Sequence, residues 1–269
     1  MNHAVSKLIV TPEKHLKLGD IDPDESHGMT KEAALDALVQ CQKRLSVLQY
    51  LLYAEGRRAL LVVLQGIDAA GKDGTIRRVM SGLNPQGVRV TPFKVPEGAE
   101  KRHDYLWRIH NSLPEYGQIG IFNRSHYEDV LVVRVHGLVP KSVWSKRYRQ
   151  INDFERMLSE NNVRILKFLL YISKEEQAKR FRQRLEDKRK NWKFSPDDVK
   201  ERQYWDAYID AYNDVLEKCS TDYAPWYVIP ANKKWFRNLA VAQIVLETLE
   251  SMKLKSPKPT ADLSNIQFE

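Results

Sequence analysis

The sequence predicts an α/β fold in which a parallel sheet is covered by helices on both faces. Short runs that are apolar on every side, typical of buried parallel strands, alternate along the chain with helical segments. A glycine-rich loop joins the first of these runs to a helix, an arrangement typical of the same class. The 269 residues, 42% hydrophobic and 29% charged, suffice for one such domain and argue against disorder.

The N-terminal part of the chain predicts one long helix ahead of the sheet. Residues 1–29 contain scattered proline, glycine and aspartate and are expected to form an irregular lead-in. Thr30 can cap a helix that ends near Glu55 and carries leucines at spacings of three, four and seven residues. A single domain is expected from residue 30 to residue 255, followed by a loosely ordered tail, 256–269, that contains two prolines.

Five strands are expected in the sheet, and helices connect them. The strands lie at residues 59–64, 88–90, 118–122, 165–172 and 226–229. Ser173 and Glu176 form a capping-box pattern at the start of one connecting helix. Another helix is expected from Asp198 to Lys218. Its stripe of Tyr204, Tyr208 and Tyr212 is interpreted as core or dimer packing.

Basic charge is concentrated in two segments. The chain has 43 Lys and Arg against 35 Asp and Glu, a net charge of +8. Residues 179–193 carry eight of the basic residues and two acids, and residues 130–149 carry five basic residues and no acid. Each run alone is typical of a solvated helix face. Two runs together with the glycine-rich loop favour a groove for polyphosphate or nucleic acid.

Cysteine usage and hydropathy exclude several classes of protein. Cys41 and Cys219 are too few and too far apart for a disulfide scaffold or a zinc site. The N-terminus has no apolar signal segment, and no run of 18 apolar residues occurs. We therefore expect a cytoplasmic protein without a membrane span.

The glycine-rich loop, residues 66–75, fits the phosphate-binding pattern G-x-x-x-x-G-K between a strand and a helix. Glycines let the backbone adopt unusual φ angles while its N–H groups point at phosphate oxygens. Lys72 supplies a mobile cation for the transferred phosphate. The residues expected to contact phosphate here are Gly66, Ala69, Ala70, Gly71, Lys72, Asp73, Gly74, Thr75 and Arg77.

Two acids set this loop apart from the general pattern. Asp73 stands where a Ser or Thr would place a hydroxyl on Mg²⁺. Asp68 adds a second carboxylate that faces the phosphates. Because acids in a polyanion site are costly unless a metal is bound, Asp68 is interpreted as a Mg²⁺ ligand. The alternative is that Asp68 stabilises an Asx-type turn.

Polar residues also follow the third strand, at the edge of the sheet where ligands bind. Arg124 can reach a phosphate bidentately, and Asn123 is a neutral ligand at best. Glu128 is a candidate second metal carboxylate, or alternatively an acid that complements a helix dipole. The residues expected to bind nucleotide are Asn123, Arg124, Glu128 and Arg134.

The basic segment 179–193 is expected to form a lid that closes over the phosphates and excludes water. The lid can supply Arg180, Arg182 or Arg184. Spacing alone does not say which of them points inward, because a helix turns about 100° per residue.

Taken together, residues 31–254 resemble the type-2 polyphosphate kinases. The resemblance rests on six motifs: Gly66-x-Asp68-x-x-Gly71-Lys72-x-Gly74, Leu83-Asn-Pro-x-Gly-Val-Arg-Val90, Asp104-Tyr-Leu-Trp-Arg108, Phe122-Asn-Arg-Ser-His-Tyr-Glu128, Trp192-Lys-Phe194 and Tyr223-Ala-Pro-Trp-Tyr-Val-Ile-Pro230. It implies a three-layer P-loop kinase-like fold with a helical lid at about residues 179–200. It also implies a homodimer or homotetramer.

The resemblance further implies reversible, Mg²⁺-dependent phosphoryl transfer between inorganic polyphosphate and a nucleotide. Adenine nucleotides are expected, with guanine nucleotides as a second candidate; no nucleic acid or membrane is expected as a partner. Asp68 and Lys72 match the family's essential acid and lysine, Arg124 its strand-end arginine, and Arg180 and Arg184 its lid arginines.

Two positions bear on the choice within the family. Many relatives have Asp where this chain has Asn123, which leaves a metal-ligand role for that position in doubt. The motif Asn-Arg-Ser-His-Tyr-Glu, which ends at Glu128, is similar to the corresponding motif of the subgroup that phosphorylates both AMP and ADP.

Two other functions stay open at this point. One is an ATP-dependent nucleoside monophosphate kinase of the thymidylate-kinase type, against which Asp73 and the excess of basic charge argue. The other is a non-catalytic protein that binds RNA or another polyanion, which would leave Asp68 and Lys72 without a purpose.

Overall fold

The computed structural model describes residues 7–12, 16–189 and 191–259. Its centre is a six-stranded sheet in the order β1-β6-β5-β2-β4-β3, parallel throughout except for the antiparallel pair β1 and β6. The strands are β1 (Ile9–Val10), β2 (Ala59–Gln65), β3 (Val88–Pro92), β4 (Ile119–Asn123), β5 (Val163–Tyr171) and β6 (Trp226–Pro230). The five predicted strands are confirmed, and β1 is an edge strand within the lead-in, where the sequence predicts none.

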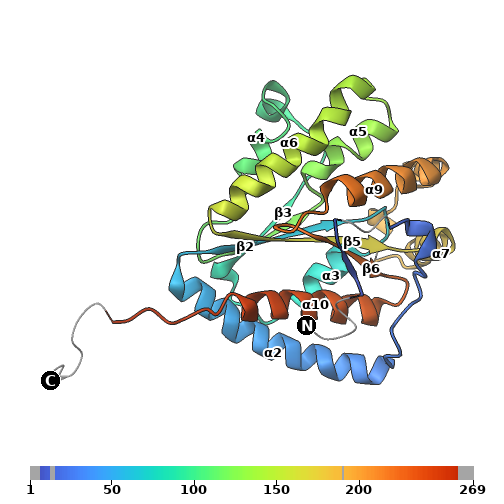
Figure 1. Cartoon of the computed structure of the whole chain (residues 1–269). Coiled ribbons are helices and arrows are strands. Elements are labelled where there is room, and N and C mark those ends of the chain that lie inside the picture. Colours follow the sequence, from blue (N-terminus) through green and yellow to red (C-terminus); the bar gives the residue numbers. More distant parts are fainter. Residues whose placement is uncertain (1–6, 13–15, 190, 260–269) are drawn as a thin grey trace.

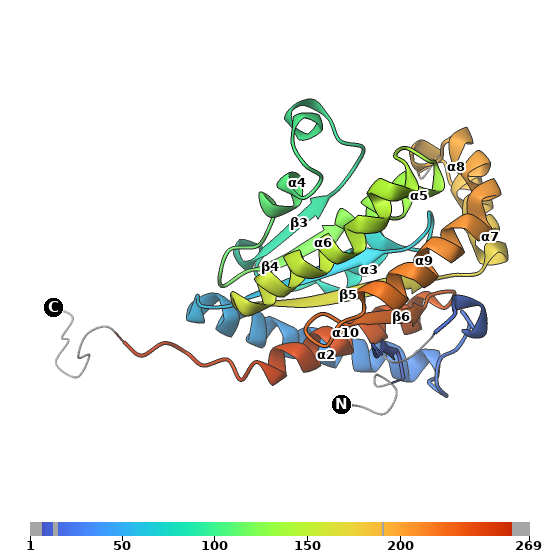
Figure 2. The same cartoon turned by 45° about the horizontal axis from the view of Figure 1, so that its top comes forward.

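Helices cover both faces of this sheet, which gives three layers (Figures 1 and 2). The helices are α2 (Lys31–Glu55), α3 (Lys72–Val79), α4 (Trp107–His110), α5 (Val132–Val135), α6 (Lys141–Glu160), α7 (Lys174–Glu186), α8 (Pro196–Glu201), α9 (Trp205–Cys219) and α10 (Lys234–Ser251). One hydrophobic core joins α2, α3 and α10 to the sheet, and a second joins α6 and α9 to its other face. The three-layer prediction is confirmed.

Local sequence signals account for the ends of several elements. The Thr30 hydroxyl accepts a hydrogen bond from the Ala33 N–H at the start of α2, which ends at Gly56 with a φ of +62°. The Ser173 hydroxyl caps α7 in the same way by accepting from the Glu176 N–H at 3.1 Å. All seven residues of β2 are buried because helices cover both faces of the strand.

The helix predicted from Asp198 to Lys218 is interrupted. The structure has the short helix α8, a 3-10 turn at Arg202–Tyr204 and then α9. Ser195 and Asp198 form a capping box at the start of α8. Of the expected tail, residues 256–259 form neither helix nor strand, and residues 260–269 lie outside the described residues. No helix of the described chain has the length and apolar character that a bilayer span requires.

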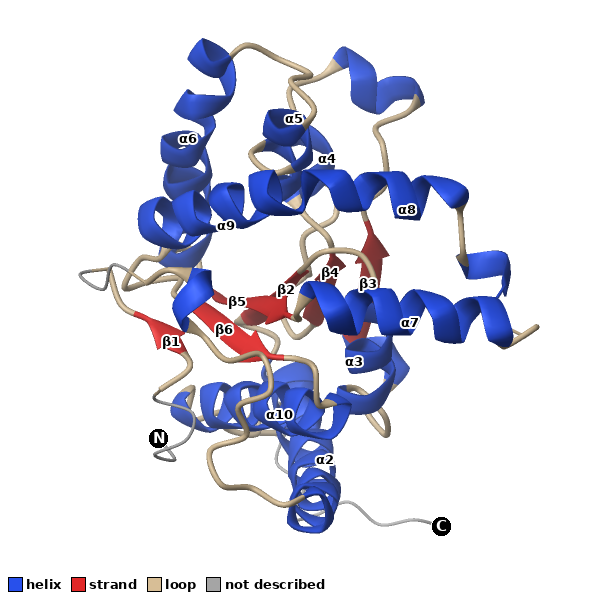
Figure 3. Cartoon of the chain, turned by 90° about the vertical axis from the view of Figure 1, so that its right-hand side faces the viewer, coloured by secondary structure: helices blue, strands red, loops and turns tan. Residues whose placement is uncertain are grey.

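The strand order brings distant segments to one edge of the sheet. β2 lies between β4 and β5, with Leu64 opposite both Asn123 and Phe168. The loop after β2 therefore meets the segment after β4 at the carboxyl ends of the strands. Figure 3 faces this edge and shows α7, α8 and α9 extending across it.

A buried charged cluster holds the segment after β4 on the sheet. Lys167, in the middle of β5, donates to the Tyr127 hydroxyl at 2.9 Å and is 2.5 Å from Oε2 of Glu155 on α6. Oε1 of Glu155 lies 3.1 Å from Nε2 of His126. The side chains of Lys167, Glu155 and His126 are fully buried, and so is that of Tyr127. Burial raises the pKa of Glu155, but the Lys167 charge and the His126 hydrogen bond outweigh it, so that this pKa is lowered.

Replacing Lys167 with methionine is expected to lower the free energy of unfolding by about 3–5 kcal/mol, because Glu155 is left as an unpaired buried charge. The measurement is urea unfolding followed by circular dichroism. The double variant Lys167→Met/Glu155→Leu removes both charges and should recover most of the loss. Equal stability of Lys167→Met and the unmodified protein would contradict this account of the cluster.

Candidate active site

The loop between β2 and α3 has the backbone that a phosphate site requires. Gly66 has a φ of +151°, and a Cβ atom there would lie 2.7 Å from the carbonyl oxygen of Leu170. Gly71 has a φ of +108° and directly precedes α3 without offering a capping side chain. The first N–H groups of α3 have no partner within the helix, so they can bind the oxygens of an anion.

Lys72, the first residue of α3, folds its side chain back onto the loop. Its Nζ donates to the carbonyl oxygen of Gly66 at 2.6 Å. Burial and the positive charge of Arg124 lower the pKa of Lys72 to about 8, although the carboxylates of Asp68, Glu128 and Asp73 oppose this shift. A phosphate group bound in the loop would supply further negative charge beside this ammonium group.

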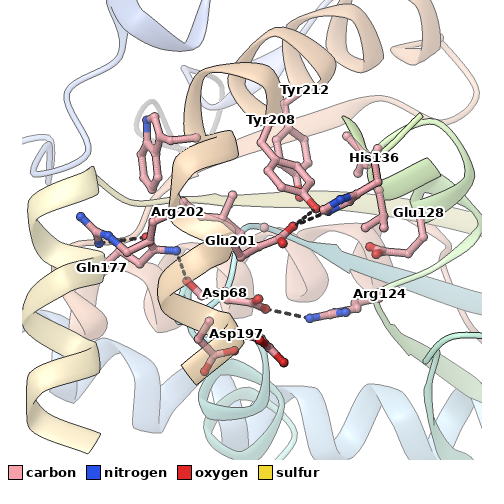
Figure 4. Close-up of a pocket in the computed structure, with 16 residues that line it drawn as sticks. Asp68, Arg124, Glu128, His136, Gln177, Asp197, Glu201, Arg202, Tyr208 and Tyr212 are labelled. Carbon is pink, nitrogen blue, oxygen red and sulfur yellow. Dashed lines mark hydrogen bonds and ion pairs between the residues drawn. The ribbon is translucent and has the colours of Figure 1, made fainter. Parts of the chain in front are cut away.

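Asp68 and Arg124 meet at the edge of the sheet. Arg124 follows β4 with a left-handed φ of +64°, and its N–H donates to the carbonyl oxygen of Leu64 on β2. Its guanidinium donates to Oδ1 of Asp68 at 2.7 Å (Figure 4). Burial raises the pKa of Glu128, and the charges of Arg124 and Lys72 oppose this only in part. Two predicted segments, the glycine-rich loop and the segment after β4, thus converge on one place.

Asn123 and Asp73 bind each other. The amide nitrogen of Asn123 donates to Oδ1 of Asp73 at 2.8 Å. This hydrogen bond links the end of β4 to the first turn of α3. The residue that departs from the general loop pattern therefore supports the neighbouring strand end.

Arg180 does not line the pocket. It is buried, and its guanidinium donates to the carbonyl oxygens of Ala69 and Ala70 at 2.9 Å and to those of Ala231 and Asn232. Its Nε donates to Glu176 at 2.8 Å. The guanidinium thus lies behind the glycine-rich loop, residues 66–75, which we call the phosphate loop, and it fixes the backbone of that loop.

The other two lid arginines lie farther along the chain. Arg182 is exposed on α7. Arg184 is half-buried, and its Nη1 lies 3.8 Å from Oδ2 of Asp198 at the start of α8. Asp198 lines the pocket, so Arg184 contacts a residue of the pocket wall although it does not line the pocket itself.

Three further predicted residues lie away from the pocket. Thr75 is buried, and its hydroxyl donates back to the carbonyl oxygen of Gly71. Arg77 is exposed on α3. Arg134 donates to the Tyr148 hydroxyl and to Asp214, and it lines a second pocket between α5, α6 and α9.

The pocket itself has a volume of about 280 Å³ and lies between the phosphate loop, the end of β4 and the helices α7, α8 and α9 (Figure 4). Gly66, Asp68, Arg124 and Glu128 are the predicted residues that line it. Polar residues that sequence reasoning missed also line the pocket: Gln177, Asp197, Asp198, Glu201 and Arg202.

Gln177 connects the phosphate loop to the segment that follows α8. Its amide nitrogen donates to the carbonyl oxygen of Asp68 at 3.0 Å, and its Oε1 accepts from Nη1 of Arg202 at 3.1 Å. No sequence pattern marks either residue, since each lies in a polar helical segment that resembles a solvated face. Only the packing of α7 against the loop brings them to the site.

The tyrosine stripe, interpreted as core or dimer packing, has a further role. Tyr212 does belong to the second hydrophobic core and Tyr208 packs against that core, but both residues also line the pocket. The Tyr208 hydroxyl donates to Oε1 of Glu201 at 2.6 Å, and the same oxygen lies 2.8 Å from Nε2 of His136 (Figure 4). This contact ties the end of α8 to the residue after α5. The four-residue spacing identifies one helix face correctly, but a face that lines a cleft has the same spacing as one in the core.

Acidic side chains outnumber basic ones around the pocket. Five carboxylates, those of Asp68, Glu128, Asp197, Asp198 and Glu201, line it together with the guanidinium groups of Arg124 and Arg202. Among the described residues, no group of three or more His, Cys, Asp or Glu side chains could hold a metal by itself. Mg²⁺ is usually held by one or two carboxylates together with substrate phosphates and water, and this donor set fits that pattern.

Comparison with known proteins places the chain in one family. The family model described as Polyphosphate kinase 2 (PPK2) matches residues 28–257. The AMP/ADP-polyphosphate phosphotransferase of Meiothermus ruber is 51% identical over 267 residues, which cover 98% of this chain and 100% of that protein. The ADP-polyphosphate phosphotransferase of Rhodopseudomonas palustris is also 51% identical, over 81% of this chain and 80% of that protein.

A solved structure agrees with these matches. The crystal structure of polyphosphate kinase 2 from Arthrobacter aurescens TC1 superimposes with a TM-score of 0.90 at 45% identity, and the match covers 93% of this chain and 90% of that one. The fold, the phosphate loop and the sequence similarity all agree. This chain belongs to the polyphosphate kinase 2 family.

Proposed function

We propose that this chain is a Mg²⁺-dependent phosphotransferase. It moves the terminal phosphate of inorganic polyphosphate to AMP, forming ADP, and to ADP, forming ATP, and it also catalyses the reverse reaction. The observation that carries this proposal is the convergence of Lys72, Asp68 and Arg124 at the phosphate loop of a chain from this family. The relative named for both acceptors, AMP and ADP, matches 98% of the chain.

The reaction needs positioning and neutralisation of charge more than a base. An acceptor phosphate is already ionised near neutral pH, so no side chain has to remove a proton from it. The loop N–H groups and Lys72 hold the donor phosphates, and Arg124 neutralises charge on the transferred group. The helices α7, α8 and α9 cover the pocket and exclude the water that would otherwise accept the phosphate.

We propose Asp68 and Glu128 as the carboxylates that hold the metal. When bound there, Mg²⁺ would neutralise negative charge on the phosphates. The Arg124 guanidinium donates to Asp68 and fixes the direction of that carboxylate. The remaining carboxylates of the pocket would repel a polyanion without such a cation.

The wider setting follows from the same proposal. We take residues 30–255 as one catalytic domain that works in the cytoplasm, where its nucleotides are found, and that assembles as a homodimer or homotetramer. Adenine nucleotides are the proposed acceptors, since the two relatives of equal identity are named for AMP with ADP and for ADP alone. Their names differ in the acceptor, which the next experiment addresses.

The test exchanges donors and acceptors. Purified protein with Mg²⁺ is given polyphosphate or ATP as donor, and AMP, ADP, GMP or GDP as acceptor, and products are separated by ion-exchange chromatography. The proposal expects phosphorylation of AMP and ADP from polyphosphate. Turnover with ATP and a nucleoside monophosphate, but not with polyphosphate, would instead support a nucleoside monophosphate kinase.

Activity is expected to fall on the alkaline side of about pH 8. Lys72 binds phosphate only when protonated, and its pKa is lowered to about 8, so kcat/KM for polyphosphate should decrease about tenfold per pH unit above that value. Bound polyphosphate stabilises the ammonium form, which should move the decrease in kcat to higher pH. Lys72→Arg is the control, because a guanidinium stays protonated. A flat profile up to pH 9.5 in the unmodified enzyme would contradict this role.

A further inference from the structure

One buried cation near the phosphate loop has no part in the account so far. Arg237 lies on α10, on the face of the sheet that α2 and α3 also cover (Figure 1). Its side chain is 3% exposed. Nη1 donates to the carbonyl oxygen of Ala70 at 3.2 Å, and Nη2 donates to Oδ1 of Asn238 at 2.9 Å. Both acceptors are neutral.

The absence of a carboxylate partner is unusual for a buried arginine. The other guanidinium behind the loop, that of Arg180, has Glu176 at 2.8 Å. Among the described residues, no acid forms an ion pair with Arg237. Burial, and then the charge of Arg180, lower the pKa of Arg237 to about 9. A buried charge without a partner is costly, so its retention needs a reason outside the unliganded fold.

The position of this charge supplies the reason. A Cβ atom on Gly71 would lie 1.9 Å from Nη1 of Arg237, so the guanidinium packs directly against the loop backbone. Arg180 and Arg237 both hold the carbonyl of Ala70 on their side of the loop. Because the carbonyl and N–H of one trans peptide unit point in opposite directions, the Gly71 N–H is directed away from them, toward the phosphate side.

We propose that Arg237 is a positioning residue for the phosphate donor. The polyphosphate bound on the opposite side of the loop is the counter-ion of the Arg237 guanidinium. Arg237 aims the Gly71 N–H at the phosphates and adds a fixed positive charge behind the backbone. Salt screens a buried charge weakly, so this contribution persists at physiological ionic strength. The inference rests on the proposed function, because it needs a polyanionic donor in the loop.

The test compares Arg237→Met with the unmodified enzyme. Removing an unpaired buried charge should leave the melting temperature without ligand unchanged or raised. The KM for polyphosphate should rise about tenfold, the KM for ADP should change less than about twofold, and tripolyphosphate should raise the melting temperature less than it does in the unmodified enzyme. Arg237→Lys keeps the positive charge but loses the planar pair of guanidinium donors. Its KM for polyphosphate should lie between those of the unmodified enzyme and Arg237→Met.

A matched control separates this role from simple packing. Arg58 is a half-buried arginine between α2 and β2 that pairs with Glu55, away from the loop. Arg58→Met should lower the melting temperature and leave both KM values unchanged. If Arg237→Met behaves like Arg58→Met, or does not fold, Arg237 is structural and the inference is wrong. If the unmodified protein uses neither tripolyphosphate nor long-chain polyphosphate, the proposed function fails, and the inference fails with it.

Discussion

Replacing Lys72 with methionine is expected to lower kcat about 10³-fold while the protein stays folded. Methionine has a similar length but no charge, and the lysine is half-buried against the loop with its Nζ 2.6 Å from the Gly66 carbonyl oxygen. We propose that its ammonium group is the mobile cation next to the transferred phosphate, and groups that stabilise charge there contribute effects of about this size. The measurement is the initial rate of ATP formation from ADP and polyphosphate.

The control for this variant is Lys43→Met, which makes the same chemical change at an exposed position on the distant helix α2. Lys43→Met should change the rate by less than about twofold. Melting temperatures of all three proteins should agree within a few degrees. A rate for Lys72→Met within tenfold of the unmodified enzyme would rule out the assigned role.

Asp68→Asn is expected to lower activity about 10²- to 10³-fold and to raise the Mg²⁺ concentration needed for half-maximal rate. The substitution keeps the shape of the side chain and removes the charge that pairs with Arg124 and that we propose holds the metal. It also separates the two interpretations of this residue, because Asn supports an Asx turn as well as Asp does. The measurement is a Mg²⁺ titration of the initial rate.

The same exchange at an exposed position, Asp36→Asn on α2, is the control and should leave the Mg²⁺ dependence unchanged. Full activity of Asp68→Asn with an unaltered Mg²⁺ requirement would favour the turn. In that case the metal would depend on Glu128 and the substrate phosphates.

The parts of the fold that the sequence predicts are those that local physics determines. β2 is apolar at nearly every position because it is buried on both faces, so its existence and its limits can be read from seven residues. Thr30 and Ser173 cap their helices through atoms three residues away. Gly66 and Gly71 of the phosphate loop are likewise required by their positive φ angles.

The parts that the sequence does not predict depend on contacts between distant elements. Arg180 stands in a run of basic residues, and its spacing gives no information about the direction of its side chain. Its burial against the loop carbonyls follows from the way α7 packs on the loop after β2. Arg134 belongs to a basic segment that resembles a groove, yet its partner Asp214 lies 80 residues away on α9.

Glu201, Arg202 and Arg237 are further residues whose positions depend on contacts between distant elements. Glu201 and Arg202 lie where the predicted helix is interrupted by a 3-10 turn, and both line the pocket. Arg237 is one of two cations in α10, a helix whose other residues are largely apolar, and its position forms no recognisable pattern. Such residues become visible only when the sheet places α10 behind the phosphate loop.

The most direct test of the central claim is luminescent detection of ATP formed by the purified protein from Mg²⁺, long-chain polyphosphate and either AMP or ADP, with Lys72→Met in parallel. We predict ATP from both acceptors and none above background from the variant. ATP from ADP alone would contradict the dual-acceptor assignment that rests on Glu128. The absence of ATP with either acceptor would contradict the proposed function itself.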